Sequence, residues 1–289
     1  MVRDEALSIV QALIAGIIQG LTEFLPISSS GHLVIYHKLT GESDGNFLGF
    51  TVLLHLATLL AVIIMFRKDL WQLLREFTAI LRDIGMKRNR HVLMRHRFLL
   101  LTVIATVPAV VAGVAVKALK LDAHLQNPFV VAAMFLVTAV FMFLINRLPK
   151  GIYSEENAPL ASAWIVGMLQ AVAILPGLSR SGSTIFGGFL GRLQKEFAVR
   201  FAFILSIPVI LGATVLEAVD FMRLQNDMTV VMETQQLLAM ATGFVSAFAT
   251  GMITIQLIKI IMQKNRFGIF GYYCLLASAV ALYVAFNYS

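Results

Sequence analysis

Between two apolar runs the chain reads Gln19-Gly20-Leu21-Thr22-Glu23-Phe24-Leu25-Pro26-Ile27-Ser28-Ser29-Ser30-Gly31-His32. A second stretch of the same kind reads Pro176-Gly177-Leu178-Ser179-Arg180-Ser181-Gly182-Ser183-Thr184. Both contain Pro and Gly, which interrupt helices, and both are rich in hydroxyl side chains. Irregular backbone and charged side chains are costly at membrane depth unless protein buries them or they line a wet cavity. We therefore predict that these stretches, the first break segment (residues 19–32) and the second break segment (residues 176–184), form a functional site.

The rest of the sequence predicts an all-α membrane protein. Of the 289 residues, 58% are hydrophobic and 13% are charged, and the mean hydropathy is +0.83. Several apolar runs approach the roughly 20 residues that a helix needs to cross a bilayer. We predict one integral-membrane domain over residues 1–289 with six transmembrane helices. Their expected bounds are 48–66, 98–117, 128–147, 197–221, 237–262 and 267–287.

The two break segments interrupt residues 6–40 and 160–192, each of which is long enough for two helices. We predict a re-entrant helix–break–helix hairpin in each of them. The two halves of the chain, 1–147 and 148–289, also share similar strings. These are Gly16-Ile17-Ile18-Gln19 with Gly167-Met168-Leu169-Gln170, Ser30-Gly31 with Ser181-Gly182, and Thr106-Val107-Pro108 with Ser206-Ile207-Pro208. Three crossings separate equivalent points, so we predict an inverted repeat whose two breaks meet near the membrane midplane.

The net charge of +7 comes from 23 Lys and Arg against 16 Asp and Glu. The basic residues gather in short loops beside the apolar runs, which is typical of cytoplasmic loops and not of a nucleic-acid surface. We predict that the basic linker 67–97 is cytoplasmic, that both termini lie outside, and that no nucleic acid is bound. The single cysteine, Cys274, excludes an intrachain disulfide.

The polar residues of the break segments suit an anion that undergoes a reaction. Gln19 and Glu23 are spaced i, i+4 and therefore lie on one helix face. Helix N-termini favour phosphate, and the planar fork of Arg180 can donate two hydrogen bonds to it. His32 adds an imidazole near these groups. The residues expected to bind phosphate are Gln19, Ser28, Ser30, Gly31, Ser179, Ser181, Gly182, Ser183 and Thr184.

Each of these residues also has a plainer interpretation. Glu23 and Arg180 can form a structural ion pair, His32 can be an interior histidine, and hydroxyls in membrane helices often bond to their own backbone. Outside the break segments, we expect His55 to pack inside the bundle and Glu217 to face the lipid headgroups. Matching polar breaks in both halves favour a site over these interpretations.

Both break segments, their separation and the basic linker closely resemble those of bacterial undecaprenyl pyrophosphate phosphatases, the integral-membrane family associated with bacitracin resistance. The resemblance covers essentially the whole chain. It implies removal of the terminal phosphate of undecaprenyl diphosphate, which recycles the lipid carrier for peptidoglycan synthesis. It also implies a homodimer in the inner membrane, with a site open to the periplasmic face. A lipid-phosphate flippase or a secondary transporter is the alternative function, because broken helices near the midplane are common in transporters.

The functional positions of that family correspond here to Glu23, Ser29, His32 and Arg180. We favour Ser29 as the nucleophile, with Glu23 or His32 taking its proton, and His32 itself is the rival nucleophile. The resemblance implies a divalent cation, Mg²⁺ or else Ca²⁺, for which Glu23 is the expected protein ligand. Some members carry Glu where this chain has Gln19, so this chain keeps a single carboxylate on that helix face.

Overall fold

The computed structural model describes residues 8–41, 44–85, 96–121, 125–225, 234–264 and 266–288, apart from the side chains of 44–46, 83–85, 223–225 and 262–263. Residues 86–95 of the predicted linker lie outside this description. Within the described part, all regular structure is helical except for one isolated bridge between Tyr153 and Leu193. Its eleven helices are α1 (Ile9–Phe24), α2 (Ser29–Thr40), α3 (Asp44–Met65), α4 (Arg67–Gly85), α6 (Arg97–Ala118), α8 (Pro128–Ile145), α9 (Leu160–Val172), α10 (Arg180–Leu190), α11 (Lys195–Gln225), α12 (Thr234–Gln263) and α13 (Gly268–Asn287).

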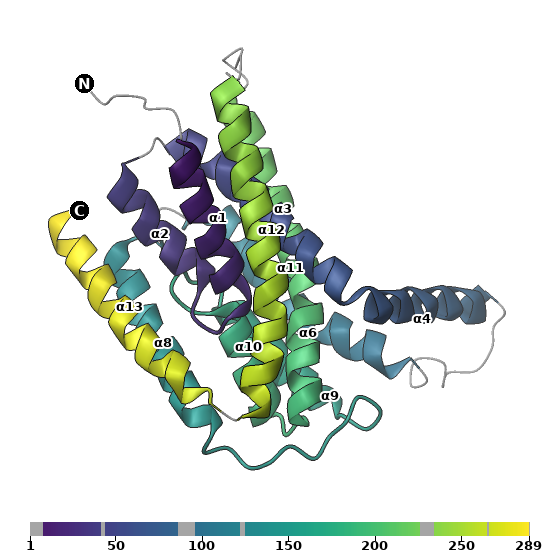
Figure 1. Ribbon diagram of the computed structural model, residues 1–289. Helices are drawn as coiled ribbons and strands as arrows, with labels where there is room; N and C mark the ends of the chain where they lie inside the picture. The colour runs from purple at the N-terminus through teal and green to yellow at the C-terminus, as the bar shows by residue number, and fades with distance from the viewer. Residues whose placement is uncertain are drawn as a thin grey trace.

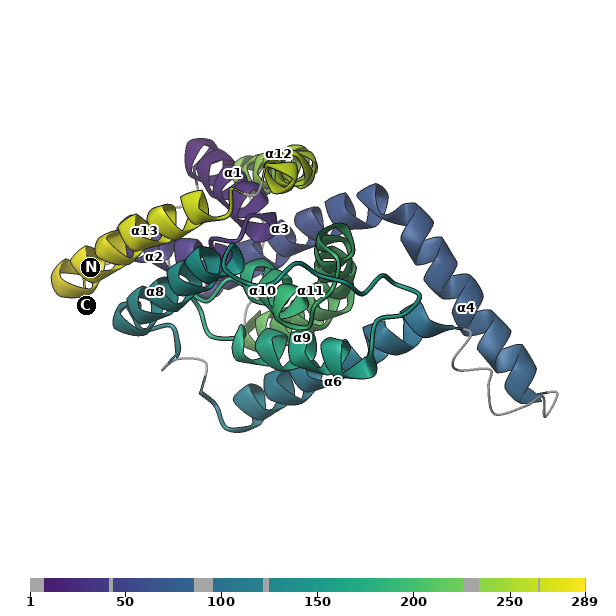
Figure 2. The same cartoon turned by 90° about the horizontal axis from the view of Figure 1, so that it is seen from below.

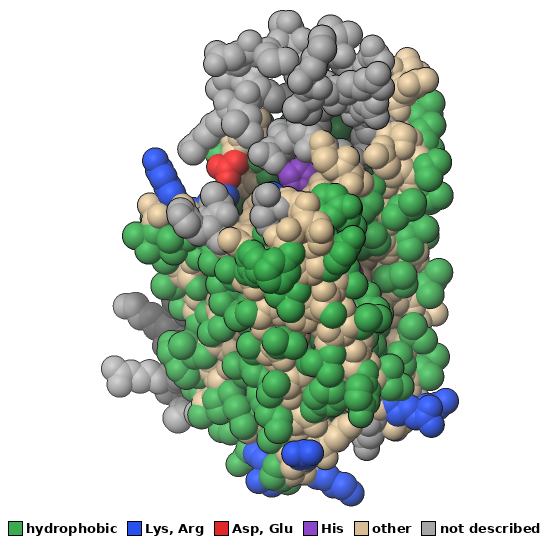
Figure 3. All heavy atoms as spheres, turned by 90° about the vertical axis from the view of Figure 1, so that its left-hand side faces the viewer, with side chains coloured by type: hydrophobic (Ala, Val, Ile, Leu, Met, Phe, Trp, Pro, Cys, Tyr) green, Lys and Arg blue, Asp and Glu red, His purple; other side chains and the backbone are tan. Residues whose placement is uncertain are grey.

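The structure has a long apolar helix at each of the six predicted crossings. Six described helices are long and apolar enough to cross a bilayer: Phe47–Met65, Arg97–Ala118, Pro128–Ile145, Lys195–Met222, Thr234–Ile261 and Gly268–Asn287. Figure 3 shows a hydrophobic band around the middle of one face, with Lys and Arg side chains gathered at its lower end and another near its upper end. The chain is therefore built as a multi-pass membrane protein.

The helices form a bundle in which a short helix lies inside. In Figure 1, α12 runs along α1, and α13 runs along α8, as their close contacts also show. Helix α9 packs against α6. Seen from below, α10 lies within the bundle, where it contacts α8, α9 and α11 (Figure 2). Because α10 begins with the second break segment, this packing places that segment in the interior of the protein.

Small residues bring α1 and α12 into close contact. A Cβ atom on Gly16 would overlap the carbonyl of Gly243 and the hydroxyl of Ser246. One turn later, a Cβ on Gly20 would approach the carbonyl of Ala247 in the same way. Small residues at such spacing let membrane helices approach closely and gain van der Waals contact. This contact fixes the helix that carries Gln19 and Glu23.

Helix α4 was not expected, because residues 67–97 were predicted only as a basic linker. It extends away from the bundle (Figure 1) and carries charged side chains among its apolar ones, which hide it from a hydropathy scan. The first turn of α4 is attached to the bundle by Asp69, whose carboxylate accepts a hydrogen bond from Arg200 of α11 at 2.5 Å. Arg200 also donates to Glu155 at 2.7 Å.

Both predicted helix–break–helix stretches are interrupted where the sequence suggested. In the first, α1 ends at Phe24 and α2 begins at Ser29. In the second, α9 ends at Val172 and α10 begins at Arg180. Each later helix has a serine at its N-cap, and that side chain accepts a hydrogen bond from a backbone N–H of the first turn. The breaks are therefore defined local structures.

Candidate active site

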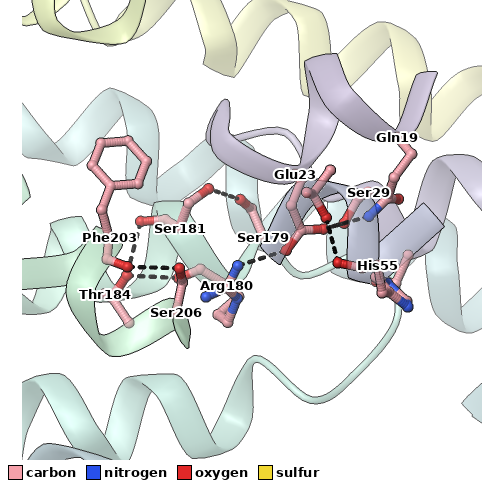
Figure 4. Close-up of polar contacts among 12 residues, drawn as sticks. Gln19, Glu23, Ser29, His55, Ser179, Arg180, Ser181, Thr184, Phe203 and Ser206 are labelled. Carbon is pink, nitrogen blue, oxygen red and sulfur yellow. Dashed lines mark hydrogen bonds and ion pairs between the residues drawn. The ribbon is translucent and has the colours of Figure 1, made fainter. Parts of the chain in front are cut away.

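The carboxylate of Glu23 is the centre of the polar contacts in the two break segments. Glu23 lies in the last turn of α1 and is only 7% exposed. Its Oε2 accepts hydrogen bonds from Ser29 Oγ at 2.6 Å and from Gln19 Nε2 at 3.0 Å. Its Oε1 accepts one from Arg180 Nη2 at 2.6 Å, as Figure 4 shows. Four of the predicted site residues are thus brought together by one buried carboxylate.

The first break segment turns the chain sharply after Glu23. Ser28 has a left-handed φ of 68°, a conformation that costs energy for any residue other than glycine. Its side chain caps α2 by accepting a hydrogen bond from the Gly31 N–H at 3.3 Å, and it shares a 3.3 Å hydroxyl contact with Ser30. Ser29 becomes the first residue of α2, so its hydroxyl lies at a helix N-terminus.

The second break segment is held by a threonine from α8. Thr138 Oγ1 donates to the Gly177 carbonyl at 3.1 Å and accepts from the Ser179 N–H at 3.0 Å. Gly177 has a φ of 93°, which glycine adopts without steric cost. Ser179 then caps α10 by accepting from the Gly182 N–H at 3.1 Å, and Arg180 is the first residue of that helix.

The two break segments touch each other. Ser181 Oγ donates to the Leu25 carbonyl at 2.9 Å, and its hydroxyl lies 3.1 Å from that of Ser179. A Cβ atom on Gly31 would lie 2.8 Å from Gly177 Cα, which is closer than real Cβ contacts. Glycine at position 31 is therefore needed for the two breaks to approach, and this approach carries Arg180 to Glu23.

His32 lies apart from the contacts around Glu23. One ring nitrogen, Nδ1, is 2.7 Å from the Ser28 carbonyl, and the other, Nε2, is 2.8 Å from Tyr273 Oη. Ser29, by contrast, already has a carboxylate partner. The two candidate nucleophiles, Ser29 and His32, therefore have different hydrogen-bond partners in the structure.

The last two predicted phosphate-binding residues, Thr184 and Ser183, lie at the end of the second break segment. The Thr184 hydroxyl donates to the backbone carbonyls of Arg180 and Ser181, at 2.9 and 3.1 Å. The Ser183 hydroxyl is fully buried and has no hydrogen-bond partner in the described part of the chain. Of the predicted phosphate-binding residues, Gln19 alone bonds to Glu23 in the described part of the chain, and phosphate binding by all of them stays a prediction.

A second polar pair lies near Glu23 and was not anticipated as a pair. His55 Nδ1 of α3 lies 3.1 Å from Glu217 Oε2 of α11, and both side chains are largely buried. Figure 4 places His55 beside the Glu23 carboxylate. The expectation that Glu217 faces the lipid headgroups is therefore wrong, because its carboxylate bonds inward to the histidine. The sequence alone offers no signal for a pair separated by 162 positions.

The described residues hold few ligands for a metal ion. No group of three or more His, Cys, Asp or Glu side chains in the described ranges could hold one. Glu23 does have a second oxygen donor nearby, since Gln19 Oε1 is buried and finds no hydrogen-bond partner among the described residues. One carboxylate and one amide oxygen suit a hard cation that takes its other ligands from water and from a diphosphate. Glu23 and Gln19 fit such a cation.

Comparison with known proteins decides the family. The model of the family described as Bacitracin resistance protein BacA matches residues 12–280. The chain belongs to this family. The match contains both break segments and all six apolar helices except the last residues of α13. The resemblance inferred from the two break segments is thereby confirmed.

Relatives that resemble this chain over most of its length carry the name undecaprenyl-diphosphatase. One from Methanobrevibacter smithii is 38% identical over 272 residues, which cover 93% of this chain and 94% of the relative. One from Desulfosudis oleivorans is 37% identical over 279 residues, with coverage of 95% and 98%. A third, from Methanosphaera stadtmanae, is 33% identical over 281 residues, with coverage of 96% and 98%.

Proposed function

We propose that this chain is an undecaprenyl-diphosphatase, which hydrolyses undecaprenyl diphosphate to undecaprenyl phosphate and inorganic phosphate. This reaction recycles the lipid carrier for cell-wall synthesis, and faster recycling would confer the bacitracin resistance for which the family is named. Membership of the BacA family and the shared name of the relatives support the proposal.

One observation in the structure carries the proposal. Ser29 and Arg180 are the first residues of α2 and α10, and both bond to the carboxylate of Glu23. A negatively charged group therefore already lies between two helix N-termini, with a guanidinium beside it. Helix N-termini and arginine are the groups that proteins use to hold phosphate. The diphosphate of the substrate would bind at the same place.

The contacts of Ser29 support it as the nucleophile. Its hydroxyl already donates to Glu23 Oε2 at 2.6 Å, the geometry a general base needs. As the Ser29 oxygen bonds to the terminal phosphorus, Glu23 takes its proton and the bond from phosphorus to the bridging oxygen breaks. Undecaprenyl phosphate leaves, and water then hydrolyses the phosphoserine to release phosphate. Arg180 neutralises charge on the transferring phosphoryl oxygens.

The rival assignment places the phosphoryl group on His32. Trapping the phosphoenzyme and mapping the modified residue separates the two, because only the serine ester is stable to acid and labile to base. A phosphohistidine at residue 32 without phosphoserine would remove Ser29 from the nucleophilic role.

We propose that a divalent cation, Mg²⁺ or Ca²⁺, accompanies the substrate. Glu23 and Gln19 would hold it, while diphosphate oxygens and water would supply its other ligands. When bound, the cation would offset negative charge on the diphosphate. Carboxylate and amide oxygens both suit either ion, so the donor set does not discriminate between them.

We also propose that the two hairpins are re-entrant and related by an inverted repeat over residues 1–147 and 148–289. The order of helices pairs α1 with α9, α2 with α10, α3 with α11, α6 with α12 and α8 with α13. Contacts are exchanged between these partners: α1 packs on α12 as α9 packs on α6, α3 packs on α12 as α11 packs on α6, and α2 touches α13 as α10 touches α8. This exchange supports a two-fold relation between the halves.

One pair of matched residues supports the two-fold relation between the halves, and another pair of matched strings does not. Gly16 allows α1 to approach α12, and its matched residue, Gly167, allows α9 to approach α6 at Ala105. The similarity between the strings at Thr106 and Ser206 falls on α6 and α11, which hold different places in the two halves, so it gives no support.

In the membrane, we place the basic linker in the cytoplasm and the site toward the periplasmic face of the inner membrane. The positive-inside rule supports this orientation, because most Lys and Arg of the sequence fall in loops on the same side as the linker 67–97. A homodimer rests on the family resemblance alone.

Phosphate release from undecaprenyl diphosphate by the purified protein in detergent tests the proposal. We expect multiple turnovers that need no gradient across a membrane. A flippase or a secondary transporter would release no phosphate under these conditions, and that outcome would refute the assignment.

A further inference from the structure

The surroundings of His32 bring an unassigned tyrosine into the site. Tyr273 of α13 bonds to His32 Nε2 through its hydroxyl at 2.8 Å, although 241 positions separate the two residues. Their rings are stacked, with centroids 5.6 Å apart and planes at 17°. Phe135 of α8 meets the imidazole edge-on at 5.2 Å. The histidine ring is therefore held between aromatic side chains from two helices.

The backbone of the first break segment determines the tautomer of His32. Nδ1 lies 2.7 Å from the Ser28 carbonyl, and a carbonyl oxygen can only accept a hydrogen bond, so Nδ1 carries a proton. In the neutral ring, Nε2 then has the lone pair and accepts the hydrogen bond from Tyr273. The strained φ of 68° at Ser28 sets the direction of that carbonyl. Any proton that His32 takes or gives is consequently exchanged at Nε2, beside the tyrosine hydroxyl.

We propose that Tyr273 is a positioning residue of the active site, which acts through His32. Ser28 fixes the tautomer, and the tyrosine hydroxyl fixes the rotation of the ring and the direction of the Nε2 lone pair. His32 lies three residues after Ser29, so both project from neighbouring positions on the first turn of α2. A rotated imidazole would present Nε2 elsewhere, and the hydroxyl from α13 opposes that rotation at this nitrogen. The kinetic test of this inference rests on the proposed phosphatase function.

Tyr273→Phe removes the hydroxyl and keeps the stacked ring. We expect kcat to fall about tenfold with little change in KM, because one hydrogen bond that aligns the histidine is lost. Tyr272→Phe is the matched control. Tyr272 neighbours it on α13, is 71% exposed and packs edge-on against Phe143, so its variant should keep the wild-type rate.

Two measurements distinguish action through His32 from a merely structural role. In a His32→Gln background, Tyr273→Phe should cause no further loss of kcat, because the group it aligns is gone. An equal loss in both backgrounds would overturn the proposal.

The second measurement is the ¹⁵N NMR spectrum of histidine-labelled protein, with the His32 signals assigned by their loss in His32→Gln. Removing a hydrogen-bond donor should shift the Nε2 resonance in Tyr273→Phe but not in Tyr272→Phe, and an unchanged resonance would refute the contact. This spectrum does not depend on turnover. A wild-type protein that released no phosphate would refute the proposed function, while the spectrum would still decide the role of Tyr273.

Discussion

The Glu23–Arg180 pair can be neutralised one partner at a time or both at once, and this separates a structural from a catalytic role. Arg180 Nη2 lies 2.6 Å from Glu23 Oε1, and the two side chains are 15% and 5% exposed. The informative set of variants is Glu23→Gln, Arg180→Gln and the double variant that carries both changes. Glu23→Gln keeps the shape of the side chain, Arg180→Gln replaces a longer side chain with a shorter polar one, and both remove the charge.

Stability should depend on whether a charge is left alone. Removing one partner of a buried ion pair costs about 3–5 kcal/mol, whereas replacing both partners with neutral groups is often much less costly. The single variants should therefore unfold at clearly lower temperatures than the wild type. The double variant should recover much of that loss, since no buried charge is then left without a partner.

Activity should not recover with stability. Loss of one donor that stabilises transition-state charge typically slows turnover about 10²- to 10³-fold, and Gln at position 23 cannot accept the proton of Ser29. Hence all three variants should release phosphate at least about 100-fold more slowly than the wild type.

The assay is to measure the unfolding temperature and the rate of phosphate release on the same detergent-purified samples. Arg200→Gln is the matched control. Arg200 is likewise an arginine paired with carboxylates, in its case two of them. Its side chain, however, is 34% exposed and lies outside the break segments. It should cost at most about 1 kcal/mol and leave the rate unchanged. A double variant that regained both stability and activity would refute the catalytic role and leave the pair as a structural one.

Three further outcomes test the geometry of the site. In Gly31→Ala, the added Cβ would lie 2.7 Å from Phe135 Cζ and push the break segments apart, so the unfolding temperature and the rate should both fall, whereas Gly212→Ala, with nothing within 4 Å, should change neither. Thr138→Val removes the hydroxyl that makes two hydrogen bonds to the second break segment, and should cost about 1–3 kcal/mol in thermal unfolding. Equal unfolding temperatures for this variant and for Thr242→Val, whose exposed hydroxyl bonds only to its own helix, would count against that support. Excess chelator should stop phosphate release until Mg²⁺ or Ca²⁺ is added back, and an undiminished rate would remove the cation from the reaction.

The crossings could be predicted because the bilayer imposes a length and a composition on each helix. Even the interrupted helices were visible, since Pro26 and Gly177 lie between apolar runs. Helix α4 could not be found in this way, because its charged residues lower its hydropathy below that of a crossing. The similar strings in the two halves suggested which helices correspond to each other, but not which helices pack together.

For the site, the sequence identified residue types but not their partners. Gln19, Glu23 and Arg180 stood out because polar and charged side chains are rare inside apolar sequence. Tyr273 and Thr138 did not, because a tyrosine or threonine in an apolar run is common and needs no special explanation. Their roles arise from contacts over long separations in the chain, which only the packed structure supplies.

The ion pair also explains how binding and chemistry could be linked. In the described structure Arg180 is bonded to Glu23 Oε1, while Ser29 is bonded to Oε2. A diphosphate that takes the guanidinium for itself must release Oε1 from Arg180, and it leaves the hydrogen bond of Ser29 in place. Glu23 Oε2 then stays in place to take the serine proton while Arg180 turns to the phosphate oxygens. We therefore expect Arg180 to pair with Glu23 at rest and with phosphate oxygens when substrate is bound, so the structural and catalytic interpretations of the pair describe two states of one site.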